Sequence, residues 1–285
     1  MQEAAAQRVL SWGLAQLRDL PWRQTRDPWA VLVSEVMLQQ TQVERVIPRW
    51  FEFLDAFPTA QECAAAGLGD VLRLWQGLGY PRRARNLHTA AIGVTELGRF
   101  PDTLAGLLDL PGVGQYTARA VLAFAFEKDA AVVDTNIARI FARLAGRRLT
   151  AREVQSMADA ALPGENVWAW NQCIMDLGAV LCRPTSPLCG DCPLRDACAY
   201  RGTGDDPAIG SANVSVAQSR FEGSDRQGRG RLMKALGVSP VHADSLATTM
   251  QWPDQPERAT RVATTLVVDG LATFDETTGT FQLPR

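Results

Sequence analysis

The 285-residue sequence lacks the features that would place it in a membrane or a secretory pathway. No stretch approaches the roughly 20 uncharged apolar residues that a membrane-spanning helix needs. The first ten residues contain Glu3 and Arg8, where a secretory signal would be apolar. We therefore expect a cytoplasmic protein without a membrane partner. A large excess of positive charge is also absent, since the net charge is -2, so any affinity for nucleic acid must come from local patches.

Cysteine is too scarce for a disulfide scaffold, with six in the whole chain. Cys63 and Cys173 stand alone in apolar helical sequence, and we interpret both as inert core thiols. The other four have the spacing Cys-x6-Cys-x2-Cys-x5-Cys and are Cys182, Cys189, Cys192 and Cys198. Thiolates suit both zinc and iron–sulfur clusters, but zinc ribbons usually contain two Cys-x2-Cys pairs, and only one is present. The spacing predicts a metal site and favours an iron–sulfur cluster, with structural zinc as the alternative.

Strict alternation of apolar and polar residues is absent from the first two thirds of the chain. From residue 2 to about residue 180, apolar residues recur every three or four positions, which is typical of helices, and prolines divide the pattern into segments. Segments 102–108 and 134–144 each begin with an aspartate, a residue suited to the N-terminal cap of a helix. The sequence therefore predicts a mostly α fold.

The composition changes after residue 200. Residues 201–219 are rich in Gly, Ser, Asp and Ala, which predicts a linker. Residues 220–285 contain three predicted helices, 226–236, 243–252 and 257–269, followed by a predicted hairpin over 271–283. Three helices and a hairpin suggest a winged-helix-like unit. Its first helix is basic, through Arg226, Arg229, Arg231 and Lys234, which fits either a DNA-contacting face or an ordinary solvated one.

A glycine-rich turn, Leu110-Pro111-Gly112-Val113-Gly114, separates two predicted helices; we call these residues the phosphate hairpin. Glycine allows a tight turn and a close approach of the backbone to a ligand. The helix that follows presents unpaired N–H groups and the positive end of its dipole, which together suit a phosphate. A Gly-x-Gly pair by itself is more often only a turn.

Two carboxylates lie in sequence that favours burial. Glu35 stands in the middle of the nearly continuous apolar run 30–40, and burial of a carboxylate that is not fully paired raises its pKa, which would provide an acid at neutral pH. Taken alone, a structural glutamate paired with an arginine is the more common interpretation. Asp134 begins a predicted helix, so it is a candidate cap and also a candidate ionised carboxylate that stabilises positive charge on a sugar. An acid and an ionised partner would divide the chemistry between them.

Five segments occur in the order found in the MutY-type adenine DNA glycosylases of the endonuclease III, or helix-hairpin-helix, superfamily. They are Ser-Glu-Val-Met-Leu-Gln-Gln-Thr-Gln-Val, Gly-Leu-Gly-Tyr, Leu-Pro-Gly-Val-Gly-Gln-Tyr-Thr-Ala, Val-Asp-Thr-Asn and the four cysteines. The resemblance covers roughly residues 8–200. It implies a six-helix domain, residues 23–130, that contains the phosphate hairpin, and a cluster domain, residues 1–22 plus 131–200, that holds one 4Fe–4S cluster. It also implies a monomer that works on the DNA of a bacterial nucleoid.

The resemblance further implies hydrolysis of the glycosidic bond of adenine mispaired with guanine or 8-oxoguanine in double-stranded DNA, after the base is flipped out. Glu35 would protonate the adenine, Asp134 would stabilise the oxocarbenium ion, and Asn136 and Tyr116 would support the acid and the water. The adenine pocket would be lined by Arg18, Trp22, Arg23 and Leu38. Gln40 and Tyr80 would fill the gap in the base stack, and Thr41 would also bind the substrate. Phosphate would be bound by Leu110, Gly112, Val113, Gly114 and Gln115. Without the resemblance, Trp22 and Tyr80 would be interpreted as ordinary core or surface aromatics.

Departures from the family pattern keep two alternatives open. Tyr116 stands where strand-cleaving relatives have a Schiff-base lysine, which predicts base release without efficient strand cleavage. A thymine-removing branch shares the tyrosine, so a thymine or pyrimidine glycosylase is one alternative, and a non-catalytic iron–sulfur DNA-binding protein is the other. Residues 201–285 are too few for the Nudix-like domain with which family members read 8-oxoguanine, and they resemble the shortened C-terminal region of actinobacterial relatives. Pro81 replaces a common second aromatic, which predicts a stiffer loop at Tyr80.

Overall fold

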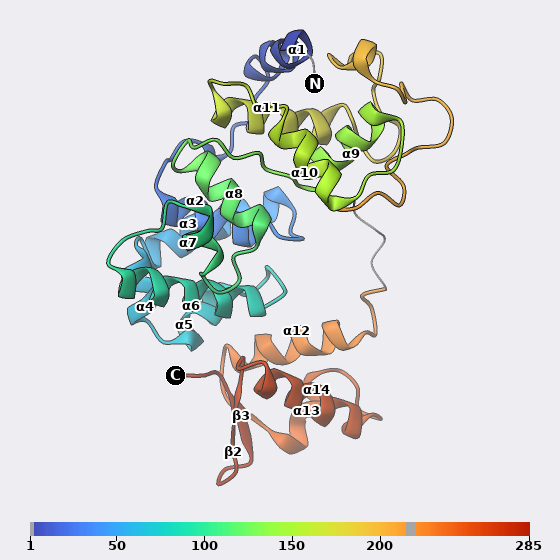
Figure 1. The fold of residues 1–285 in the computed structure, drawn as a ribbon. Helices are drawn as coiled ribbons and strands as arrows, with labels where there is room; N and C mark the ends of the chain where they lie inside the picture. The colour runs from blue at the N-terminus through green and yellow to red at the C-terminus, as the bar shows by residue number, and fades with distance from the viewer. Residues whose placement is uncertain (1–2, 215–219) are drawn as a thin grey trace. The chain divides into compact units, whose positions relative to one another are not determined.

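The computed structural model describes residues 3–214 and 220–285, and it is mostly helical, as the sequence predicts (Figure 1). Within these ranges, no helix is long and apolar enough to cross a membrane. The N-terminal elements are α1 (Glu3–Leu14), η1 (Pro21–Arg23), α2 (Pro28–Leu38), α3 (Val43–Ala56), α4 (Ala60–Ala65), α5 (Leu68–Leu74), α6 (Arg82–Leu97), α7 (Leu104–Leu108) and α8 (Gln115–Phe124). The central elements are α9 (Thr135–Ala145), α10 (Ala151–Asp159), α11 (Val167–Val180) and η2 (Arg195–Ala197). The C-terminal elements are α12 (Asp225–Leu236), β1 (Val241–His242), η3 (Ala243–Ser245), α13 (Leu246–Thr249), α14 (Pro256–Val268), β2 (Thr273–Asp275) and β3 (Thr280–Gln282).

The chain divides into two compact units. The first unit contains α1, η1, α7 to α11 and the four clustered cysteines. The second contains α3 to α6 and all elements from α12 to β3, so the C-terminal helices belong to the same unit as α4 to α6. Helix α2 begins in the first unit and ends in the second.

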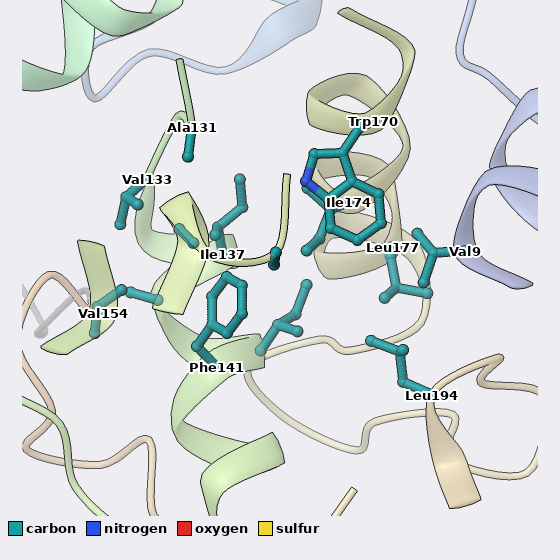
Figure 2. Packing of buried hydrophobic residues seen from close by; sticks show 14 of the residues in the cluster. Val9, Ala131, Val133, Ile137, Phe141, Val154, Trp170, Ile174, Leu177 and Leu194 are labelled. Atoms are coloured by element: carbon teal, nitrogen blue, oxygen red, sulfur yellow. The ribbon is translucent and has the colours of Figure 1, made fainter. Parts of the chain in front are cut away.

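The core of the first unit lies among α1, α9, α10 and α11 (Figure 2). Val9 of α1, Phe141 of α9 and Trp170 of α11 are each at most 2% exposed there, and Leu194 of the cysteine loop closes the cluster. Helices α1 and α11 approach so closely that a Cβ on Gly13 would lie 2.4 Å from the Sγ of Cys173. The thiol of Cys173 is therefore a core group, as the sequence predicts, and burial raises its pKa to about 11.

Local sequence signals account for where several helices begin and end. Thr59 and Thr150 form reciprocal capping boxes with Glu62 and Glu153, which start α4 and α10. Helices α6 and α9 end at glycines in the left-handed conformation, which glycine adopts without a steric penalty. The predicted aspartate cap of segment 102–108 is one residue early, because the hydroxyl of Thr103 accepts from the N–H of Gly106 at the start of α7.

The C-terminal part of the second unit contains the three predicted helical segments and the predicted hairpin. Residues 243–252 are less regular than predicted, since they form η3 and a single turn, α13. The strands form an antiparallel sheet in the order β1-β3-β2, and β1, which is only two residues long, has too short a pattern to be predicted. Gly228 of α12 packs directly on Trp252, where a Cβ would meet the ring at 2.1 Å.

The predicted linker 201–219 is partly integrated into the first unit. Asp206 forms an ion pair of 2.6 Å with Arg143, and Ala208 is 2% exposed. The polar composition of residues 201–214 therefore reflects ion pairing and turns. Residues 215–219 lie outside the described residues.

Candidate active site

Helix α2 buries the candidate acid. Residues 31–37 are all buried, and Glu35 within this run is only 4% exposed. The apolar sequence of α2 makes the helix hydrophobic on every face, which is expected of a helix enclosed by protein. The predicted burial of Glu35 is therefore confirmed, and burial in such surroundings favours the neutral form of a carboxyl group.

The Asp134 carboxylate caps α9. One oxygen accepts from the backbone N–H of Ile137 at 2.7 Å, and the other accepts from the side-chain amide of Asn136 at 2.8 Å. Burial raises the pKa of Asp134, while these hydrogen bonds and the charge of Arg139 act in the opposite direction. The carboxylate thus has a fixed orientation and donors that favour its ionised form, so the predicted capping role is confirmed.

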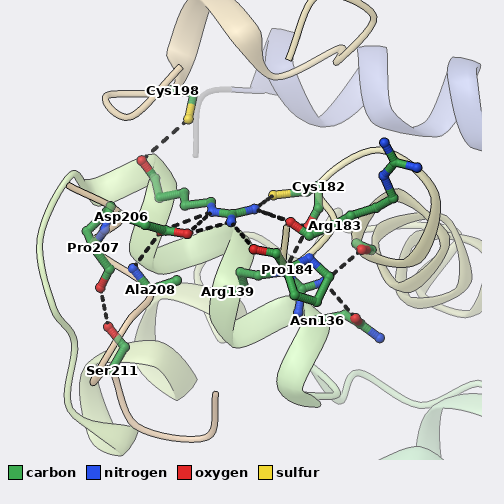
Figure 3. A network of polar contacts seen from close by, with 12 residues as sticks. Asn136, Arg139, Cys182, Arg183, Pro184, Cys198, Asp206, Pro207, Ala208 and Ser211 are labelled. Carbon is green, nitrogen blue, oxygen red and sulfur yellow. Dashed lines mark hydrogen bonds and ion pairs between the residues drawn. The ribbon is translucent and has the colours of Figure 1, made fainter. Parts of the chain in front are cut away.

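A chain of hydrogen bonds leads from Asp134 through Asn136 and Arg139 to Cys182, and Figure 3 shows its part from Asn136 onwards. The amide oxygen of Asn136 accepts from Arg139 at 2.7 Å, and the same guanidinium donates to the carbonyl of Cys182 at 2.7 Å. Gly178 of α11 makes this possible, because a Cβ there would lie 2.6 Å from the Cβ of Asn136. Arg139 also donates to the carbonyl of Gly178 at 2.7 Å, so α9 and α11 are joined at this point.

The four cysteines surround one pocket, together with Arg143, Arg195 and Tyr200. Arg143, which is 2% exposed, donates to the carbonyl oxygens of Cys182, Arg183 and Pro184 and to the Sγ of Cys182 (Figure 3). Within residues 3–214 and 220–285, no three Cys, His, Asp or Glu side chains converge as the ligands of a single metal ion would.

The predicted pocket residues near the N-terminus form an ion-paired group. The two terminal nitrogens of the Arg23 guanidinium, Nη1 and Nη2, each donate to Asp176 at 2.8 Å, and Arg18 binds the same carboxylate at 2.6 Å. Trp22, between them in sequence, is 7% exposed. Asp176 was not among the predicted site residues, although an aspartate within the apolar sequence of α11 is the same signal that pointed to Glu35. These arginines lower the pKa of Asp176 against the effect of burial.

Gln40 and Tyr80, which are predicted to fill the gap in the base stack, share an uncommon backbone conformation. Gln40 has a φ of 58° and Tyr80 has a φ of 48°, and both are exposed. A side chain other than glycine at positive φ is disfavoured, and such residues cluster at functional sites. Thr41 and Leu38, which lie beside Gln40, are half-buried.

A buried arginine that the sequence analysis missed joins the two loops that carry Gln40 and Tyr80. Arg83, 9% exposed, donates to Thr41 at 3.1 Å and to the carbonyl oxygens of Leu78 and Gly79 at 3.0 and 3.1 Å. It also caps the end of α2 by donating to the carbonyls of Val36 and Met37 at 2.7 and 2.9 Å. Burial lowers its pKa to about 10, so it remains charged at neutral pH.

The phosphate hairpin has the backbone that its glycines predict. Gly112 has a φ of 78°, and a Cβ there would lie 2.5 Å from the Cβ of Asn86, so both conformation and packing require glycine. Gly114 is the N-cap of α8 and would place a Cβ in open space. Leu110 and Val113 are buried, Gln115 is exposed, and Tyr116 is half-buried in the first turn of α8.

Comparisons with known proteins identify relatives of this chain. Residues 33–163 match the family model described as HhH-GPD superfamily base excision DNA repair protein. An adenine DNA glycosylase from Mycolicibacterium smegmatis is 39% identical over 273 residues, which covers 92% of this chain and 90% of the relative. A human adenine DNA glycosylase is 41% identical over 68% of this chain and 38% of its own length.

Two solved structures each resemble 69% of the chain. A thermostable thymine-DNA glycosylase superposes with a TM-score of 0.66 at 30% identity, covering 69% of this chain and 94% of its own. An endonuclease III trapped as a covalent intermediate with DNA superposes with a TM-score of 0.62 at 24% identity, which supports the fold alone.

Proposed function

Because the chain belongs to the HhH-GPD superfamily of base excision DNA repair proteins and to its adenine DNA glycosylases, we propose that it hydrolyses the glycosidic bond of adenine paired with guanine or 8-oxoguanine. It would act on double-stranded DNA as a monomer and extrude the adenine from the helix, since a stacked base is out of reach of an active site. The observation that carries the proposal is the burial of Glu35 in the apolar α2, at the position where the family has its acid.

Glu35 is proposed as the general acid. Burial favours the neutral form of a carboxyl group, and a protonated Glu35 could donate its proton to a nitrogen of the leaving adenine. Protonation makes the departing base neutral, which lowers the barrier to cleavage of the carbon–nitrogen bond.

Asp134 is proposed to stabilise the oxocarbenium ion that forms on the sugar. Two N–H groups hold its oxygens in place, so an ionised carboxylate would be pre-oriented towards the developing positive charge. Asn136 would position this carboxylate, and Tyr116 would help to place the water that adds to the sugar. Tyr116 has no amine for a Schiff base, so the abasic strand would stay intact.

The remaining predicted residues are assigned to binding. Arg18, Trp22, Arg23 and Leu38 would shape the adenine pocket, with Asp176 as the ion partner that orients the two arginines. Gln40 and Tyr80 would fill the space left by the extruded base, and Thr41 would bind the substrate beside them. Backbone N–H groups of Leu110, Gly112, Val113, Gly114 and Gln115 would bind DNA phosphates, and the open space at Gly114 leaves room for them.

The cysteine loop is proposed to hold one 4Fe–4S cluster. All four cysteines line one pocket, and their spacing contains a single Cys-x2-Cys pair where a zinc ribbon usually contains two. A 4Fe–4S cluster takes four thiolate ligands, each on a different iron atom. Cys182, Cys189, Cys192 and Cys198 would be its ligands, and the cluster would stabilise the loop that Arg143 and Arg139 contact.

We propose two functional domains and a C-terminal module. Residues 23–130 would form the six-helix domain, and residues 1–22 with 131–200 the cluster domain. Residues 220–285 would form the winged-helix-like unit, which the arrangement of α12, α13, α14 and the sheet β1-β3-β2 supports.

The test is a substrate panel on the purified holo-protein. Duplexes with adenine opposite 8-oxoguanine, adenine opposite guanine and thymine opposite guanine are incubated under single-turnover conditions, and the released base is identified. We expect adenine from the first two duplexes and strand breaks only after alkali. Glu35→Gln should abolish release while DNA binding persists, and Glu96→Gln, an exposed position in the same unit, should leave release unchanged.

A thymine glycosylase is the second candidate, and it is favoured by the superposition on a thymine-DNA glycosylase. Release of thymine without adenine would establish that candidate and refute the first. Absence of any released base, with DNA binding retained, would point to a non-catalytic protein.

A further inference from the structure

The C-terminal part of the second unit contacts the loop that carries Tyr80. Gln76, just before this loop, donates to the carbonyl of Met233 in α12 at 3.1 Å. Arg226, also in α12, donates to the hydroxyl of Tyr80 at 3.3 Å. Both contacts lie within the second unit and on opposite sides of residues 77–79. We call residues 77–81 the wedge loop.

Asp269 links α12 to α6, the helix that follows the wedge loop, by ion pairs. This residue ends α14, is 7% exposed, and forms ion pairs with Arg82 of α6 and Arg229 of α12. Its backbone carbonyl accepts from Arg85, one turn further along α6. The Arg229 side chain is 20% exposed, so its pair with the buried carboxylate is little screened, whereas the Arg82 side chain is 64% exposed and its pair is screened more strongly.

The arginines of α12 are therefore mostly directed at protein. Arg229 binds Asp269 and the hydroxyl of Thr265, and Arg231 donates to the carbonyl of Met250 at 2.7 Å. Neither is arranged as a phosphate contact. Of the four basic residues in this helix, Arg226 is the one that meets the wedge loop, and Lys234 is exposed.

Tyr80 is held from two directions. Its ring lies over the buried guanidinium of Arg83, with 5.6 Å from the ring centre to the Cζ, and its hydroxyl meets Arg226. Its left-handed backbone and the preceding Gly79, with a φ of 72°, direct the side chain outwards, where 39% of it is exposed. A rigid, exposed aromatic ring with one anchored polar end is suited to enter a base stack in a single orientation.

We propose that residues 220–285 brace the wedge loop and that Arg226 is a positioning residue for Tyr80 during extrusion of the adenine. This inference rests on the proposed function, because it assigns the C-terminal unit a part in that same reaction. Arg226 would limit the rotation of the Tyr80 side chain, so that the ring fills the gap in the stack as the adenine leaves. Its loss would lower the fraction of complexes in which the base is extruded.

The experiment measures single-turnover adenine release from the duplex with adenine opposite guanine, using the full-length holo-protein at saturating and at sub-saturating concentrations. Arg226→Ala should lower the rate constant at saturation by about three- to tenfold, the effect of one ordinary hydrogen bond on the extruded state. Arg226→Lys, which retains a donor, should recover part of the loss. Lys234→Ala removes the same charge from the same helix and should leave the saturating rate constant unchanged.

Tyr80→Phe identifies the route of the effect, since it keeps the ring and removes the hydroxyl. In the Tyr80→Phe background, Arg226→Ala should cause no further loss. The inference is refuted if Arg226→Ala slows the reaction equally with and without the hydroxyl, or if Arg226→Ala only weakens DNA binding and leaves the saturating rate constant unchanged. A wild-type protein that releases no adenine would refute the proposed function instead, so the two failures are distinguishable.

Discussion

The side-chain amide of Asn136 donates to the carboxylate of Asp134 at 2.8 Å, and its oxygen accepts from Arg139 at 2.7 Å. The nitrogen and the oxygen of this one side-chain amide are therefore both hydrogen-bonded, which fixes the direction of the hydrogen bond that reaches Asp134. Arg139 also binds the carbonyl of Cys182, so the orientation of the Asp134 carboxylate depends on the backbone of the cysteine loop.

Asn136→Ala should shift the pH dependence of adenine release. The amide favours the ionised form of Asp134, so its removal should raise the pKa of that carboxyl group still further above its ordinary value. Protonated Asp134 cannot stabilise a cation, so the decline in rate on the acidic side should begin at a higher pH than in the wild type. We expect about a tenfold lower rate at neutral pH, measured by single-turnover kinetics from pH 5 to 9. An acidic limb at an unchanged pH would refute the positioning role.

Gly178→Ala should separate α9 from α11. The new Cβ would lie 2.6 Å from the Cβ of Asn136, so the helices must shift, at a cost of about 1–3 kcal/mol in the free energy of unfolding. Gly230→Ala is the matched control, since it adds the same methyl group to a helical glycine that has nothing within 4 Å. It should stabilise the protein by about 0.5–1 kcal/mol. Urea denaturation measures both, and equal effects would contradict the close approach seen here.

Asp176→Asn should destabilise the first unit. Removing one charge from a buried ion pair leaves Arg23 without its counter-charge, which costs about 3–5 kcal/mol. Asp70→Asn, which breaks an exposed pair with Arg73, should cost less than about 1 kcal/mol.

Asp176 also predicts a pH dependence of stability. Its pKa is lower in the folded protein than in the unfolded chain, so its stabilising effect is fully present above the unfolded value of about 3.9 and is lost as the pH falls through the folded pKa. Asp176→Asn should therefore weaken the acid dependence of unfolding below about pH 4. If the free energy of unfolding had the same slope against pH in both proteins, the pKa of Asp176 would not be lowered by folding.

Gly112→Ala and Gly114→Ala should separate folding from phosphate binding. Alanine at 112 meets Asn86 and requires a positive φ, so it should lower the melting temperature as well as the affinity for DNA. Alanine at 114 has open space in the free protein and should leave the melting temperature nearly unchanged. It should still weaken DNA binding, measured by titration at two salt concentrations, because the methyl group occupies the approach of a phosphate. Unimpaired binding by Gly114→Ala would place the phosphate elsewhere.

Cys192→Ser should remove the proposed cluster, seen as a loss of iron and of visible absorbance, and should lower the melting temperature of the first unit. Cys63→Ala is the control, because Cys63 is a buried thiol of the second unit whose pKa burial raises to about 12. That variant should retain its iron content. Zinc in place of iron in the wild-type protein would refute the cluster assignment.

Local sequence was sufficient to predict the features that depend on a single helix or turn. The apolar run around Glu35 was sufficient to predict its burial, Asp134 followed by helix-forming sequence was sufficient to predict a cap, and Gly112 was sufficient to predict a tight turn. Each of these depends on neighbours within a few residues. Burial and backbone conformation at that range are set by hydrophobic periodicity, capping and the absence of a Cβ.

The tertiary structure alone decided which distant groups meet. Arg23 meets Asp176 across 153 positions, Arg226 meets Tyr80 across 146, and Arg82 meets Asp269 across 187. Periodicity identifies the buried face of a helix but not the helix that covers it, so a charged residue can be predicted to need a partner without the partner being identified. Those partners depend on the packing of the helices, which no short stretch of the chain specifies.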